Sequence, residues 1–288
     1  RQRLSEIQTQ LINNGALGIG WVVTFVNKGR ITPDGDKAFS KSLSQAPSVL
    51  AMFENDKGIY PKTTGTVILG EDQGGTFATG VTQNIPILAQ SANQGIAVAR
   101  AEVDSLVRRI PLLLRTPDGW VPAFSTEVLK ILAGADTYVI RTNDNGLEEI
   151  RVKGLPAVPV DSLGRKWISF VNTSQTDLQE MDVEGRFVFV GFTAKGIMPQ
   201  LSTPVGYLEP HKIQAALAES ILIENSPYVP DYALAVETGI LLVSMGLMWL
   251  ILNVFGISLG ITLGTVLMAG TAYYGFWTIQ QGLLIDVT

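Results

Sequence analysis

The chain has 288 residues, of which 46% are hydrophobic and only 16% are charged, and its formal net charge is −5. Soluble domains usually carry about 25% charged residues, so this chain is poor in charge, and disorder, collagen and coiled coil are excluded as its main architecture. One histidine and no cysteine exclude zinc sites of the common nitrogen and sulfur kinds within one chain. The chain is acidic and its basic residues are dispersed, which argues against nucleic acid as a partner.

Residues 1–230 alternate helical and strand-like segments. The spacing of apolar residues predicts helices over 4–12, 36–43, 122–132 and 210–223. Short apolar runs predict a strand over 48–53 and buried strands over 18–25, 167–171 and 187–190. Two more strands, over 137–141 and 147–152, flank the sequence Asn-Asp-Asn-Gly, which is a strong hairpin signal. This alternation predicts a mixed α/β sheet.

Residues with obvious catalytic chemistry are scarce. A serine triad would need His211, the single histidine, and no G-x-S-x-G elbow exists to pair with it. Gly15, Gly18 and Gly20 precede a strand, whereas the dinucleotide-binding fingerprint follows a strand and opens a helix. We therefore expect no catalytic residue, no metal site and no cofactor in these residues.

Arg108 and Arg109 form a basic pair directly before an apolar run at 110–114. Two neighbouring guanidinium groups can bind an anionic ligand. A solvated strand end is the simpler alternative. Both arginines are therefore candidate ligand-binding residues with two open interpretations.

A long loop over 193–206 follows the strand expected at 187–190. In open α/β sheets, ligands bind in loops beyond the carboxyl ends of strands. Thr193 and Lys195 are the candidate ligand contacts of this loop, and an ordinary connection is the alternative. Gly191, at the end of the strand, would allow a close backbone approach or a sharp turn.

Residues 231–288 contain no lysine or arginine. We expect two membrane spans there, at about 233–252 and 257–278, because about 20 apolar residues cross a hydrocarbon core of roughly 30 Å. The short segment between them requires a tight antiparallel hairpin, and membrane lipid is then a partner. A buried hairpin in a soluble protein is the alternative, but such helices rarely run this long without charge.

Three residues are candidates for signal transmission. Pro227 and Pro230 lie directly before the first span, and two prolines in four residues make a stiff junction that can transmit a shift. Glu237 lies about one turn inside the first span, where we expect an interfacial position.

Three segments of the sequence together carry a family resemblance. FVFVGFTAKG at 187–196, with STPVG at 202–206 and KIQAALAESIL at 212–222, resembles the closing motif of the CHASE type-2 family of extracytoplasmic sensory domains. The segment 108–132 is similar to its central strand, turn and helix, and 18–43 is similar to its first half. The sequence departs from the family at Gln214-Ala215, where a His-Ala pair is typical, so any role of that histidine is in doubt.

The resemblance implies a multi-pass protein of the bacterial cytoplasmic membrane. It implies an extracytoplasmic sensory domain over 1–230, clipped at its N-terminus and preceded by one span, and a transmembrane region over 231–288 with two of three following spans. It also implies a cytoplasmic output module outside these residues, commonly an adenylate or guanylate cyclase, a histidine kinase or a serine/threonine kinase.

On this basis we expect the signal-sensing region of a membrane receptor, which acts as a homodimer and responds to an unknown extracytoplasmic ligand. Two alternatives stay open. One is a membrane-anchored structural or assembly module that binds another protein of the cell envelope. The other is an extracytoplasmic enzyme, against which the lone histidine counts.

Overall fold

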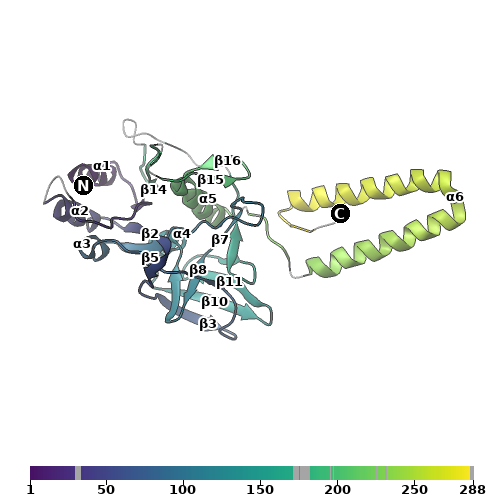
Figure 1. The fold of residues 1–288 in the computed structure, drawn as a ribbon, viewed down its shortest axis with the longest axis horizontal. Coiled ribbons are helices and arrows are strands. Elements are labelled where there is room, and N and C mark those ends of the chain that lie inside the picture. The colour runs from purple at the N-terminus through teal and green to yellow at the C-terminus, as the bar shows by residue number, and fades with distance from the viewer. Residues whose placement is uncertain are drawn as a thin grey trace. The chain divides into compact units, whose positions relative to one another are not determined.

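The computed structural model describes residues 1–29, 34–170, 175, 182–194, 196, 198–224, 226–230 and 232–285. The chain forms two compact units, Arg1–Glu224 and Asn225–Thr288. Figure 1 shows the helices and strands of each unit.

A parallel sheet forms the first part of unit 1. Its strands lie in the order β14 (Phe187–Val190), β1 (Gly18–Trp21), β2 (Ser48–Ile59) and β6 (Asn93–Ile96). The first strand of the chain, β1, therefore pairs with a strand about 170 residues later in the sequence. A short strand, β5 (Val81–Thr82), pairs antiparallel with the second half of β2.

Helices cover both faces of this sheet. Leu50 belongs to one hydrophobic cluster and its neighbours Val49 and Ala51 belong to another, so the two clusters lie on opposite faces of β2. The Leu50 cluster includes residues of the first three helices, and the other cluster includes residues of the fourth. These helices are α1 (Gln2–Asn13), α2 (Gly35–Leu43), α3 (Pro86–Ala89) and α4 (Phe124–Leu132).

Glycine allows α4 to approach the sheet closely. A Cβ atom at Gly95 would lie 2.6 Å from the Cα of Phe124, and one at Gly20 would lie 2.9 Å from the end of the Phe124 ring. Both distances are shorter than a van der Waals contact, so only glycine fits at these positions.

The second part of unit 1 is built from four small sheets. One contains the antiparallel strands β12 (Ala157–Pro159), β11 (Gly146–Val152) and β10 (Thr137–Asn143), with β3 (Gly65–Leu69) parallel to β10. Another contains β4 (Thr76–Phe77), β8 (Leu113–Thr116) and β9 (Gly119–Pro122). The remaining pairs are β13 (Arg165–Trp167) with β7 (Arg109–Pro111), and β15 (Leu201–Thr203) with β16 (Gly206–Leu208).

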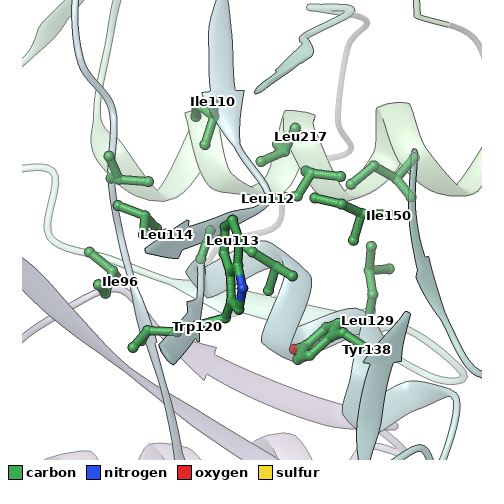
Figure 2. Packing of buried hydrophobic residues seen from close by; sticks show 14 of the residues in the cluster. Ile96, Ile110, Leu112, Leu113, Leu114, Trp120, Leu129, Tyr138, Ile150 and Leu217 are labelled. Carbon is green, nitrogen blue, oxygen red and sulfur yellow. The ribbon is translucent and has the colours of Figure 1, made fainter. Parts of the chain in front are cut away.

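A hydrophobic core joins these sheets to α4 and to the last helix of the unit, α5 (Pro210–Leu222). Figure 2 shows Trp120 and Tyr138 on one side of this core and Leu217 of α5 on the other. Leu113 and Ile150 fill the space between, and both are at most 1% exposed. Each large apolar side chain buried in this way contributes about 1.5–3 kcal/mol.

The mixed α/β fold and its principal helices are confirmed. The predicted hairpin turn is also confirmed, because Asn143 pairs with Gly146 across β10 and β11. Gly146 has a φ of 127°, a left-handed value that favours glycine.

The structure differs from the prediction at several points. The strand predicted at 18–25 ends at Trp21. The helix predicted to begin at residue 122 begins at Phe124, because Pro122 is the last residue of β9. The strand predicted at 167–171 ends at Trp167, because the N–H of Ser169 turns to the hydroxyl of Ser220 on α5; residue 171 lies outside the described residues. β14 is half-buried rather than buried, as expected for a strand at the edge of its sheet.

Unit 2 is a hairpin of two apolar helical arms. The helical segment α6 (Ala233–Gln280) contains two stretches, Ala233–Val254 and Leu259–Gln280, that are long and apolar enough to cross a membrane. The two arms run antiparallel (Figure 1). Cβ atoms at Gly260 and Gly264 would lie within 2.7 Å of Leu252 and Met248, so these glycines allow the arms to pack closely. The predicted hairpin is confirmed, although the backbone stays helical where we expected a turn.

Candidate functional site

Arg108 and Arg109 lie where the chain enters β7, and both are bound by carboxylates. Arg108 donates to Asp104 at 2.8 Å. Arg109 donates to Glu102 at 2.7 Å and to Asp161 at 3.2 Å. The basic pair predicted from sequence is therefore part of a network of ion pairs rather than a free cationic site.

This network has a further member and an aromatic cover. The Nε of Arg165 donates to Asp161 at 2.8 Å, from the neighbouring strand β13. The guanidinium of Arg109 lies 5.0 Å from the centre of the Trp167 ring, within cation–π distance. Three arginines therefore face three carboxylates, and the net charge of the cluster is close to zero.

A cavity of about 730 Å³ opens beside this network. Charged side chains line part of it, and apolar side chains, among them Val103 and Leu163, line another part. The full lining is Thr76, Arg100, Ala101, Glu102, Val103, Asp104, Arg108, Arg109, Pro111, Leu163 and Arg165. The cavity is large enough for a small molecule, and its mixed lining fits a ligand with both charged and apolar groups.

An anionic ligand in this cavity would have to replace a carboxylate that already binds the arginines. Asp104 is the most accessible, since its side chain is 49% exposed and it pairs with Arg108 across a single turn of chain. The hydrogen bond from Arg108 lowers the pKa of Asp104, and the same bond raises the pKa of Arg108. Both groups therefore stay charged over the physiological pH range.

The loop candidates lie elsewhere in unit 1. Thr193 is exposed and follows β14, at the carboxyl end of the parallel sheet. Lys195 lies outside the described residues. Arg109 belongs to the β7–β13 pair and Arg108 directly precedes it, so the structure brings the two arginines together but gives no contact between them and Thr193. All four residues remain candidates.

The end of β14 shows the close approach that Gly191 was expected to allow. A Cβ atom at Gly191 would lie 2.3 Å from Nδ1 of His211, near the start of α5. His211 is half-buried, and burial lowers the pKa of its imidazole. The single histidine is thus a packing residue that holds α5 against β14.

A buried polar cluster joins α4 to two strands. Glu127, which is 2% exposed, accepts hydrogen bonds from the hydroxyl of Tyr138 at 2.8 Å and from the amide of Asn93 at 2.6 Å. Lys130 pairs with the same carboxylate at 2.9 Å. Burial first, and then the charge of Glu127, raises the pKa of Tyr138 well above its usual value. The other three side chains all bind the Glu127 carboxylate, so the cluster is structural.

Pro227 and Pro230 belong to unit 2. Between them lies Tyr228, whose main-chain N–H and C=O groups both form hydrogen bonds. The N–H of Tyr228 donates to the carbonyl oxygen of Gly282 at 3.0 Å. The N–H of Leu284 donates to the carbonyl oxygen of Tyr228 at 2.9 Å. We call these two bonds the Tyr228 bridge; they join the segment that enters the hairpin to the segment that leaves it.

Several residues close in sequence to the Tyr228 bridge are buried. Thr278 is 1% exposed, Ala233 is 4% exposed and Ile285 is 6% exposed. Pro230 is also buried, and its carbonyl oxygen accepts from the N–H of Ala233 at 2.9 Å. The proline junction is therefore packed as well as stiff. Asp231, within the junction, lies outside the described residues.

Glu237 is half-buried about one turn after the start of α6, and the interfacial position expected for it stays a prediction. Its role in signal transmission stays a prediction. Among the described residues, no group of three His, Asp or Glu side chains is arranged to hold a metal ion.

Sequence reasoning missed the carboxylates that bind the arginines and the Tyr228 bridge. Asp104 lies four residues before Arg108, a spacing that suits a local ion pair and was readable from the sequence. Asp161 is 52 residues from Arg109, and the bridge joins residues more than 50 positions apart. Such partners carry no local signal.

A mixed α/β unit joined to an apolar helical hairpin defines a protein with a folded domain carried by candidate membrane spans. Residues 1–255 match the family model of the CHASE2 domain. The chain therefore belongs to the CHASE2 family, whose members are extracytoplasmic sensory domains of receptors. No curated protein and no solved structure matches the chain.

Proposed function

We propose that this chain is the sensory and membrane-coupling region of a bacterial receptor in the cytoplasmic membrane. Residues 1–230 lie outside the cytoplasm, and α6 crosses the membrane twice. The region regulates a nucleotide cyclase or a protein kinase elsewhere in the full-length protein. An extracytoplasmic ligand changes the sensory unit, and two copies of the receptor transmit the change.

The Tyr228 bridge is the observation that carries this proposal. α5 ends at Leu222 and α6 begins at Ala233, so only a short linker separates the sensory unit from the hairpin. Because Tyr228 is bound to Gly282 and Leu284, a displacement of the linker acts at the same time on the start of α6 and on the segment after its end. A connection of this kind suits a relay better than a flexible tether does.

The topology is tested by labelling single cysteines with a membrane-impermeant thiol reagent. The chain has no cysteine, so each introduced thiol is the only target. Asn145→Cys lies in the exposed β10–β11 turn and should be labelled in intact spheroplasts. Asn253→Cys, near the tip of the hairpin, should be labelled only after lysis. The reverse pattern would overturn the proposed orientation.

Activity of the full-length receptor separates sensing from anchoring. If the sensory unit regulates an output, deleting residues 1–224 should change cyclase or kinase activity and remove its response to extracytoplasmic conditions. If activity is unaffected while the receptor mislocalises or loses a partner in the envelope, the structural or assembly function is correct instead.

A further inference from the structure

The strand β3 is an unprotected edge of its sheet. It pairs with β10 on one side, and it has no other strand partner among the described residues. Figure 1 shows it as the outermost strand of that sheet. In an edge strand, every second residue directs its N–H and C=O groups away from the sheet, where another strand can bind them.

Proteins usually protect such edges with proline or charge, and the two edges of this sheet differ in that respect. The opposite edge strand, β12, ends in Pro159 and follows Pro156. β3 has the sequence GTVIL, with no proline and no charge. Its side chains Val67 and Leu69 are 49% and 47% exposed. An exposed apolar edge without protection is a template for pairing with another strand.

The residues that flank β3 carry opposite charges. Lys62 lies before the strand, is exposed, and forms no ion pair with any described residue. Glu71 and Asp72 lie after the strand and are also exposed. Asp72 pairs with Arg115 at 3.1 Å, yet its side chain stays 52% exposed. The strand is thus basic at one end and acidic at the other, which makes it complementary to itself in an antiparallel arrangement.

We propose that β3 pairs with β3 of a second copy of this chain, antiparallel and around a two-fold axis at Val67. In this register Val67 faces Val67 of the other copy, and Gly65 faces Leu69. The same register places Lys62 opposite Asp72 twice, once at each end. Opposed side chains in an antiparallel pair lie on the same face, so Val67 and Leu69 of both copies form one apolar patch.

The size of this interface fits a receptor held in a membrane. A pair of five-residue strands buries less than the roughly 1,600 Å² of a stable complex between soluble proteins. Two copies anchored in one membrane have a high effective concentration, so a small interface suffices to join them. This proposal deepens the receptor function proposed above by naming the surface between two copies, and its test does not depend on signalling.

Disulfide formation in the intact, membrane-bound chain tests the register. In Val67→Cys, two thiols face each other at a Cα separation of about 4.5–5.5 Å, which suits a disulfide. Leu69→Cys is the matched control, because it lies on the same strand and the same face with similar exposure. Its two copies would be four residues out of register, about 13 Å apart along the strand, too far for a disulfide.

Under mild oxidation, we expect Val67→Cys to give a covalent dimer and Leu69→Cys to give little. Phe77→Cys, which is 63% exposed on β4, measures random collisions in the membrane. Equal cross-linking of Val67→Cys and Phe77→Cys, or stronger cross-linking of Leu69→Cys, would overturn the proposal.

Charge exchange provides an independent test. Lys62→Glu should reduce cross-linking of Val67→Cys several-fold, because it places like charges together at both ends of the pair. Adding Asp72→Lys should restore the cross-linking. If Lys62→Glu has no effect, or if the double exchange fails to restore dimers while circular dichroism shows a folded protein, the antiparallel register at Val67 is wrong. Loss of β3 pairing with an intact sensory response would leave the receptor function standing.

Discussion

The main-chain N–H of Leu284 donates a hydrogen bond to the carbonyl oxygen of Tyr228 at 2.9 Å. With the bond from Tyr228 to Gly282, it holds the chain that enters the hairpin beside the chain that leaves it. The two segments are far apart in sequence and both lie outside the helical segment α6. Their contact therefore joins the two ends of the hairpin at its base, in addition to the packing between its arms.

Leu284→Pro should open this base. Proline has no N–H, so the bond to Tyr228 is lost, while Leu284→Ala keeps the N–H and serves as the control. We expect the amides of Ser226, Tyr228 and Val229 to exchange with deuterium several-fold faster in the proline variant, measured by mass spectrometry in nanodiscs. Unchanged exchange would mean that the neighbouring buried side chains hold the base closed without the hydrogen bond.

Replacing Pro227 and Pro230 with glycine should uncouple output from input. Glycine makes the linker flexible, and a flexible linker absorbs a displacement instead of transmitting it. Inserting two to four Gly-Ser residues after Tyr228 should act more strongly, since it also lengthens the chain between the Tyr228 bridge and the start of α6. The measurement is the regulated cyclase or kinase activity of the full-length receptor, with circular dichroism as the folding control. Regulation that survives the insertion would show that the rigid-junction mechanism is incorrect.

Lys166 should make the stability of unit 1 depend on pH. It is 5% exposed in β13, opposite the core residue Ile110, and forms no ion pair with a described residue. Burial lowers its pKa from 10.5 to about 8, and the charge of Glu224 only partly opposes this. Between these two values the unfolded chain binds a proton that the folded chain does not, so this residue makes stability rise with pH across that window. Below it, the full penalty of burying the charge is present.

Lys166→Met should therefore stabilise the protein at pH 7, by about 1–2 kcal/mol, because it removes the buried charge. The advantage should shrink as the pH approaches 10. Urea unfolding of both proteins at pH 7, 8.5 and 10 measures the difference, and the comparison cancels the titration of other groups. A stability difference that is constant with pH would show that Lys166 keeps an ordinary pKa in the folded state.

Gly191→Ala should destabilise unit 1. The added methyl group would lie 2.3 Å from Nδ1 and 2.6 Å from Cβ of His211, so α5 must move away from β14. Overpacking of this kind costs about 1–3 kcal/mol. Denaturant unfolding measures the loss. His211→Ala in the same chain should recover only part of it, because the Cβ contact remains; full recovery would place the clash in the imidazole ring alone.

The sequence determined the elements whose pattern is local. The periodicity of apolar residues predicted α1, α2 and α5, and the Asn-Asp-Asn-Gly signal located the β10–β11 hairpin. Two apolar stretches of about 20 residues, without lysine or arginine and separated by a short segment, predicted the helical hairpin of unit 2. Such signals work because helix periodicity, turn geometry and apolar length depend on residues close together in the chain.

Tertiary structure decided which groups meet. The sequence presented Arg108 and Arg109 as a possible anion site, and folding brought Glu102 and Asp161 against Arg109 and so neutralised it. The sequence likewise gave no sign that Tyr228 binds the segment after α6, or that β3 is an edge strand of its sheet. Charge pairing and strand order depend on the path of the whole chain, since the energy of each contact is fixed only when distant segments are placed side by side.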